Sequence, residues 1–229
     1  MTVENQQQSV CRVGYAPLTW HYAVTEETPK GVNLFNSQER ANWLSLLTAH
    51  ILSSLAGVAE PCGIEVQTGS PDESSYETRL PTQKDYDALD QHLRETLHVS
   101  AIVIWFDLLW VTTRMPAAKR KIMTGWDGWI HINNYIGKDG EVEFEDGLIT
   151  VNFEFHNVIY GPEILSDEYL RKAELDAASL SKFVWRLGNF PGLKLRDVDC
   201  DPNYSDWLRS YGLSAENDFK LPDSACPPP

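Results

Sequence analysis

Several carboxylates stand where they could do chemistry, and Asp107 is the most unusual of them. It interrupts the apolar run 101–111, with Trp105, Phe106 and Trp110 close to it in the sequence. A carboxylate in such a run is costly unless it is hydrogen-bonded, exposed or protonated. Asp107 is therefore either a structural carboxylate with a donor nearby or a functional one whose pKa is raised by burial.

A second group of carboxylates follows a Gly-Ser pair. Gly69-Ser70 with Asp85 and Asp87 resembles the pattern of nucleotidyltransferases, and the resemblance implies a magnesium site with Asp107 as its third carboxylate. However, both aspartates fall within a helical pattern, and side chains two residues apart on a helix point in different directions. The alternative interpretation is that they are solvated helix charges.

A third group alternates along the chain near its C-terminal end. Asp197, Asp199 and Asp201 share one face if extended, which resembles the start of a calcium-binding loop. Such a loop needs Gly where Pro202 stands and Glu where Leu208 stands. The segment is therefore interpreted as a strand that turns into a helix.

Charge favours a basic partner over nucleic acid. The chain of 229 residues has 19 basic and 33 acidic side chains, a formal net charge of -14, which repels phosphate over most of the surface. One basic cluster near Trp126 and Trp129 could contact phosphate, but the favoured interpretation is a solvated loop that balances nearby acids. That cluster comprises Arg114, Lys119, Arg120 and Lys121.

The composition indicates a folded protein of a reducing compartment. Hydrophobic residues make up 42% of the chain, enough for a core. No signal peptide precedes residue 9, and the longest apolar run is too short to span a membrane. Phosphate-loop, dinucleotide, hydrolase and zinc-helix motifs are absent, and the scattered Cys11, Cys62, Cys200 and Cys226 fit neither a disulfide framework nor a metal site. We expect a cytoplasmic protein with no metal and no cofactor.

Hydrophobic periodicity and helix-capping residues predict the helices and strands that carry these residues. Asn36 and Glu39 form a capping box for a helix to Leu55, and Thr82 caps a second helix. The run 101–111 is typical of a central strand covered on both faces. Further expectations are a strand at 63–68, a flexible loop at 69–80, a helix at 166–187, a strand at 193–198 and a short helix from Asp201. Residues 1–213 form one domain and 214–229 a flexible tail.

Two turn signals in the segment 129–156 predict an antiparallel meander. With turns at Gly140 and Asp146-Gly147, Ile136 pairs with Val142, and Glu143 lies opposite both Tyr135 and Thr150. The fold class is therefore α+β, a mixed or mostly antiparallel sheet with this central meander (about 129–156), packed on one face by two or three helices. The other face is either ordinary solvated sheet or a partner-binding surface made of His131, Asn133, Tyr135, Glu141, Glu143, Thr150, Asn152 and Glu154.

These observations favour a non-catalytic acidic binding protein that neutralises a basic protein partner. An immunity protein or antitoxin that masks a toxin, or an inhibitor that mimics nucleic-acid charge, has this character. The alternatives are a metal-dependent enzyme that uses carboxylates including Asp107, and a subunit of a larger assembly whose exposed rings anchor an interface.

Overall fold

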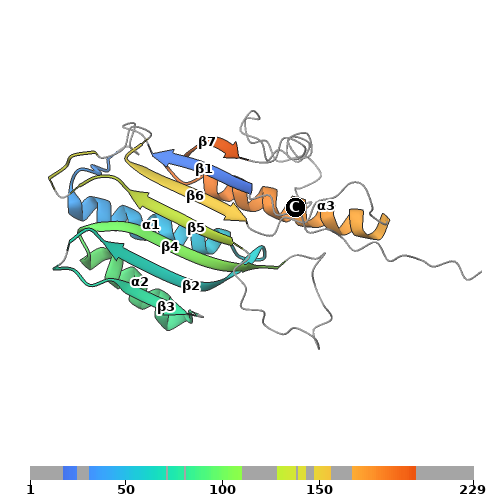
Figure 1. Cartoon of the computed structure of the whole chain (residues 1–229), viewed down its shortest axis with the longest axis horizontal. Coiled ribbons are helices and arrows are strands. Elements are labelled where there is room, and N and C mark those ends of the chain that lie inside the picture. The colour runs from blue at the N-terminus through green and yellow to red at the C-terminus, as the bar shows by residue number, and fades with distance from the viewer. Residues whose placement is uncertain are drawn as a thin grey trace, which may run out of the picture.

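A single seven-stranded sheet with three helices makes up the described part of the chain (Figure 1). The computed structural model describes residues 18–24, 31–70, 72–79, 81–109, 128–137, 139–142, 147–155 and 167–199. In chain order the elements are β1 (Leu18–Val24), α1 (Ser37–Ser54), β2 (Ala59–Thr68), β3 (Tyr76–Arg79), α2 (Gln83–Glu95), β4 (Val99–Leu108), β5 (Gly128–Asn134), β6 (Ile149–Phe155), α3 (Asp167–Gly188) and β7 (Lys194–Asp199).

The sheet is antiparallel throughout, with the strand order β3-β2-β4-β5-β6-β1-β7. The α+β class with a mostly antiparallel sheet is therefore confirmed. A central meander is also present, because β4, β5 and β6 are neighbours both in the sequence and in the sheet. The predicted strands at 63–68 and 193–198 correspond to β2 and β7.

The register predicted for the second hairpin of this meander is wrong. Thr150 pairs with Asn133, and Val151 pairs with Ile132, so β5 and β6 are directly adjacent with no strand between them. Val142 forms an isolated bridge with Ile136, as predicted, and Gly140 has the expected positive φ of 78°. Glu143 and the turn residue Asp146 lie outside the described residues. Both registers keep the same side chains on each face, so alternation alone did not distinguish them.

One face of the sheet is buried under the helices. Alternate strand residues such as Ile104, Ile132 and Phe153 form one hydrophobic cluster with Leu47, Ile51, Leu93, Phe183 and Val184 of the helices. The Phe153 and Phe183 rings lie 4.4 Å apart, and the Tyr22 hydroxyl donates to the Val184 carbonyl at 3.2 Å. Figure 1 shows α1, α2 and α3 behind the sheet. We call this side of the sheet the covered face.

The first residues of α1 and α2 are capped as the sequence predicts, with one difference at α1. At α2, the Asp85 carboxylate accepts from the Thr82 backbone N–H at 2.7 Å, as a capping box requires. At α1, Asn36 Oδ1 accepts from the backbone N–H groups of Gln38 and Glu39. The predicted return bond is wrong, because the Glu39 carboxylate reaches past Asn36 to the Asn33 backbone N–H at 2.7 Å.

The structure adds two strands that were not predicted. β1 lies between β6 and β7, and β3 forms an edge beside β2. β3 occupies part of the segment predicted as a flexible loop. Two of its four residues, Glu77 and Arg79, are charged, and it directly follows a segment rich in Ser, Pro, Asp and Glu, so it was assigned to the loop.

Other predictions lie beyond what the structure describes. The short helix from Asp201, the tail at 214–229 and the domain boundary at 213 stay predictions, since the description ends at residue 199. Among the helices that are described, none is long and apolar enough to cross a membrane.

Candidate functional site

The second face of the sheet is not covered by the three helices, and its side chains are largely polar. We call it the open face. The register aligns its residues in rows that run across the sheet, with one residue from each of the six strands β2, β4, β5, β6, β1 and β7. The tryptophan row consists of Gly63, Trp105, Trp129, Glu154, Thr19 and Asp199, and the histidine row of Glu65, Val103, His131, Asn152, His21 and Asp197.

The tryptophan row places two large rings side by side at the centre of the sheet. Trp105 on β4 pairs with Trp129 on β5, and both side chains are half-buried. Gly63 provides the space for the first ring, because a Cβ at Gly63 would lie 2.8 Å from Trp105 Cε3. A half-exposed indole pair on a rigid sheet is a surface that aromatic or cationic groups of a partner can cover.

The histidine row joins three neighbouring strands through polar side chains. His21 Nδ1 lies 3.0 Å from Asn152 Oδ1, and His131 is the neighbour of Asn152 on the other side. Burial lowers the pKa of His131, and the nearby Glu65 carboxylate opposes this shift. His131 is therefore mainly neutral at pH 7.

The open face has a strong excess of negative charge. By the register, its acidic side chains are Glu60, Glu65, Glu77, Asp107, Glu154, Asp197 and Asp199, and its basic side chains are Arg79 and Lys194. Arg79 forms an ion pair with Glu77 at 3.2 Å on the edge strand β3. Carboxylates thus surround a centre of rings and imidazoles.

Five of the predicted binding residues come together on this face. His131 and Asn133 lie on β5, and Thr150, Asn152 and Glu154 lie opposite them on β6. Asn133 Nδ2 donates to Thr150 Oγ1 at 3.4 Å. The half-buried Tyr135 and the exposed Glu141 follow the end of β5, and Glu143 lies outside the described residues. A role in binding stays a prediction for all eight.

Sequence reasoning missed residues that three other strands add to the same face. His21 comes from β1, Glu65 from β2 and Asp197 from β7. A signal for His21 was present, because polar residues alternate with aromatic ones from Thr19 to Tyr22. No pattern within the chain could have placed β1 beside β6, since that pairing joins segments about 130 residues apart.

Asp107 is half-buried at one end of β4, where the register sets it opposite Glu60 of β2. The strand was expected to be covered on both faces, and this is wrong, because Val103, Trp105 and Asp107 are all half-exposed. The sequence of an apolar strand does not show whether its second face is covered by other elements or holds large, partly exposed side chains. The raised pKa predicted for Asp107 stays a prediction.

The carboxylates that resemble those of nucleotidyltransferases have local roles in α2. The hydroxyl and backbone N–H of Thr82 both donate to Asp85, at 2.6 and 2.7 Å, and these hydrogen bonds lower its pKa. Asp87 accepts from Gln83 Nε2 at 3.2 Å one turn away. Their place on a helix agrees with the alternative interpretation from the sequence.

The remaining candidate sites find no further support in the structure. Asp197 and Asp199 are exposed on β7, and Asp201 lies outside the described residues, as does the basic cluster from Arg114 to Lys121. Within the part of the chain that is described, no group of three or more His, Cys, Asp or Glu side chains is arranged to hold a metal ion.

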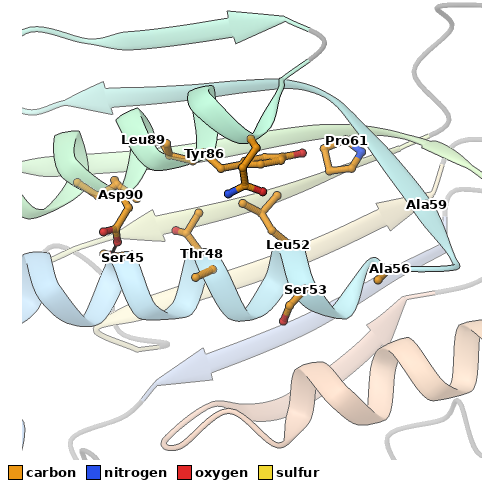
Figure 2. A pocket seen from close by; sticks show the side chains of 13 residues that line it. Ser45, Thr48, Leu52, Ser53, Ala56, Ala59, Pro61, Tyr86, Leu89 and Asp90 are labelled. Carbon is orange, nitrogen blue, oxygen red and sulfur yellow. Dashed lines mark hydrogen bonds between the residues drawn. The ribbon is translucent and has the colours of Figure 1, made fainter.

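A groove of about 420 Å³ lies on the helix side of the sheet, between α1, α2 and the start of β2 (Figure 2). Leu52, Pro61 and Tyr86 line its apolar part. At one wall, the Ser45 hydroxyl donates to Asp90, which also accepts from Arg94 Nε at 2.9 Å. The bonds from Arg94 and Ser45 lower the pKa of Asp90, so its charge is already compensated within the chain.

No family model, curated protein or solved structure matches this chain.

Proposed function

We propose that this chain binds a basic polypeptide partner on the open face of its sheet. In this proposal it is a cytoplasmic, non-catalytic protein that neutralises its partner, as an immunity protein or antitoxin masks a toxin or as an inhibitor mimics nucleic-acid charge. The observation that carries the proposal is the arrangement of two half-buried tryptophans within a ring of carboxylates on one rigid surface.

The arrangement resembles the composition of protein interfaces. Aromatic side chains are enriched at the centre of interfaces, where they are desolvated, whereas charged groups at the rim steer the partner and select its orientation. Seven strands about 4.8 Å apart span about 30 Å. With a depth of about 20 Å, the face covers about 600 Å², the low end of what one partner contributes to a standard interface.

The charge of the face favours a basic partner. Negative side chains extend from Glu77 on one edge strand to Asp197 and Asp199 on the other, so the field is spread over the whole surface. Such a field accelerates association with a positively charged protein and repels nucleic acid.

Affinity capture with a matched pair of variants tests the proposal. The face variant Glu65→Gln/Asp197→Asn removes two charges from the histidine row, and the control variant Asp87→Asn/Glu95→Gln removes the same charges from α2. With lysate of the source cell, the parent and the control variant should capture one stoichiometric protein of high isoelectric point. The face variant should bind this protein with an association rate about tenfold lower at low salt.

The salt dependence of the association rate tests whether the carboxylates of the open face attract the partner by long-range electrostatics. Raising the ionic strength should slow association for the parent and bring it close to the face variant, because salt screens exposed charges beyond about 8 Å at physiological strength. Equal association rates for the face variant and the parent at both salt concentrations would contradict the proposal.

A further inference from the structure

β7 (Lys194–Asp199) forms one edge of the sheet (Figure 1). It pairs with β1 on its inner side, and no strand lies along its outer side in the part of the chain that the structure describes. Such an edge presents backbone N–H and C=O groups that can pair with a strand of another molecule. The side chains of β7 then decide which strand fits.

The six residues of β7 are complementary to themselves when two copies run antiparallel. In one register, each basic residue of one copy lies opposite an acidic residue of the other, and the two apolar residues lie opposite each other. The pairs are Lys194 with Asp199, Leu195 with Val198 and Arg196 with Asp197, and twofold symmetry repeats each of them. Directly opposite residues have Cβ atoms about 4.5–5.5 Å apart, so opposite charges there stabilise the pairing and like charges oppose it.

An irregularity in β7 makes this register compatible with the two faces of the sheet. Leu195 lies opposite Tyr22 and Asp197 opposite His21, so the pairing with β1 skips Arg196, as at a β-bulge. The extra residue places both Leu195 and Val198 on the covered face, where both pack against the core. In a regular strand, residues three positions apart would point to opposite faces.

The faces also exclude neighbouring registers. A twofold axis normal to the sheet keeps the covered faces of both copies on the same side. A shift by one residue would set Leu195 opposite Asp197 or Asp199 of the second copy, and both of these point to the open face. The register that matches the charges is therefore also the one that matches the faces.

The charges on the two edges of the sheet are compensated differently. On the edge strand β3, Arg79 forms an ion pair with Glu77 of the same strand at 3.2 Å. On β7, Arg196 is exposed and forms no ion pair within the described part of the chain. The exposed Asp197 carboxylate accepts from the Val198 backbone N–H at 2.8 Å. The central charged pair of β7 can thus form across a contact between two copies.

We propose that two copies of this chain associate edge to edge through β7, in antiparallel register, so that the two sheets become one continuous sheet. This inference concerns the edge of the sheet and does not depend on the proposed function of the open face. Six residues of strand extend about 20 Å, which makes the contact much smaller than a standard interface. We therefore expect a reversible dimer with a dissociation constant of about 100 µM.

Sedimentation velocity of the full-length protein tests the proposal. Each copy carries a net charge of -14, so the measurement uses about 0.15 M salt, where repulsion between exposed charges more than about 8 Å apart is largely screened. The parent should be monomeric at about 5 µM and mainly dimeric at about 1 mM. Hydrogen exchange of the β7 amides should slow over the same range of concentration.

Charge reversal at the centre of the contact assigns the dimer to β7. Arg196→Asp sets acidic side chains opposite each other, and Asp197→Arg sets basic side chains opposite each other. Each variant alone should therefore dimerise at least about tenfold more weakly than the parent. Mixed in equal amounts, the two variants restore an Asp–Arg pair at both central positions, so the mixture should dimerise within about threefold of the parent. This recovery also shows that both variants fold.

Matched controls place the same charge changes away from β7. Arg79→Asp on β3 and Asp87→Arg on α2 should dimerise like the parent. The proposal is wrong if the parent stays monomeric at about 1 mM, and β7 amides that are protected in that monomer would show that another segment of the chain covers the edge. It is equally wrong if the parent dimerises but Arg196→Asp dimerises as strongly, or if the mixture of the two charge-reversal variants shows no recovery.

Discussion

The two faces of the sheet are built from alternate residues of the same strands, yet they differ in almost every physical property. On the covered face, Ile104, Ile132 and Phe153 are fully buried against the helices. On the open face, their sequence neighbours Val103, His131 and Asn152 are half-exposed and mostly polar. The comparison shows that one set of strands can carry a buried apolar face and a partly exposed, mostly polar one, because successive side chains point to opposite sides.

Adjacent residues of β4 should show the largest difference between the faces. Ile104→Ala leaves a cavity in the core and should lower the free energy of unfolding by about 2–5 kcal/mol. Val103→Ala, one residue earlier, should cost about 1 kcal/mol or less, because solvent already reaches that side chain. Chemical denaturation of both variants measures the difference, and equal losses would break the division between the faces.

Alanine substitutions of two glycines test the difference between the covered face and the open face further. A Cβ at Gly128 would lie 2.3 Å from the Glu154 carbonyl oxygen and 2.6 Å from Phe106 Cζ, so Gly128→Ala forces the backbone or the core to move. We expect a loss of about 1–3 kcal/mol. Gly63→Ala meets only the Trp105 ring at less than 3.0 Å, and the ring can turn towards solvent.

Thermal unfolding and tryptophan fluorescence distinguish these two glycine variants. Gly128→Ala should lower the midpoint temperature markedly. Gly63→Ala should shift the indole emission with a loss of less than about 1 kcal/mol. A large loss of stability at Gly63 with unchanged emission would show that Trp105 is held as tightly as the core.

Tyr22→Phe should show a small effect that depends on pH. Its hydroxyl donates to the Val184 carbonyl, so Tyr22→Phe should cost about 1 kcal/mol at neutral pH. Burial raises the pKa of Tyr22 above its ordinary value. The unfolded tyrosine ionises near pH 10 while the folded one stays neutral, so its contribution is complete below about pH 10 and declines as the pH rises further.

Denaturation at pH 8 and pH 11 compares Tyr22→Phe with the parent. The difference in stability between them should shrink or reverse at the higher pH. A difference that stays constant would show that Tyr22 is accessible enough to ionise in the folded state.

Much of the local structure could be predicted from the sequence, because caps and periodicity act over a few residues. Asn36 and Thr82 mark the starts of α1 and α2, and Gly140 has the positive φ that its turn requires. The strand β3 was missed for the same reason, since it has only four residues and follows a segment whose composition is typical of a loop.

Pairing between distant segments could not be predicted in this way. The turns at Gly140 and Gly147 favoured a third strand between β5 and β6, but β6 pairs directly with β5 instead. Side-chain alternation has a period of two, so it assigns residues to a face without choosing the strand beside them. The predicted face was therefore correct for Thr150, whereas the partner expected for it, Glu143, was not, because Thr150 pairs with Asn133.

By itself the sequence determined the α+β class, the acidic charge and the polar alternation of β5 and β6, since these depend on composition and on neighbouring residues. Only the tertiary structure decided that His21, His131 and Asp197 share one row. The physical reason is that β1 closes a pairing with β6 across about 130 residues of chain, and the burial of the whole covered face, not any local preference, stabilises that long closure.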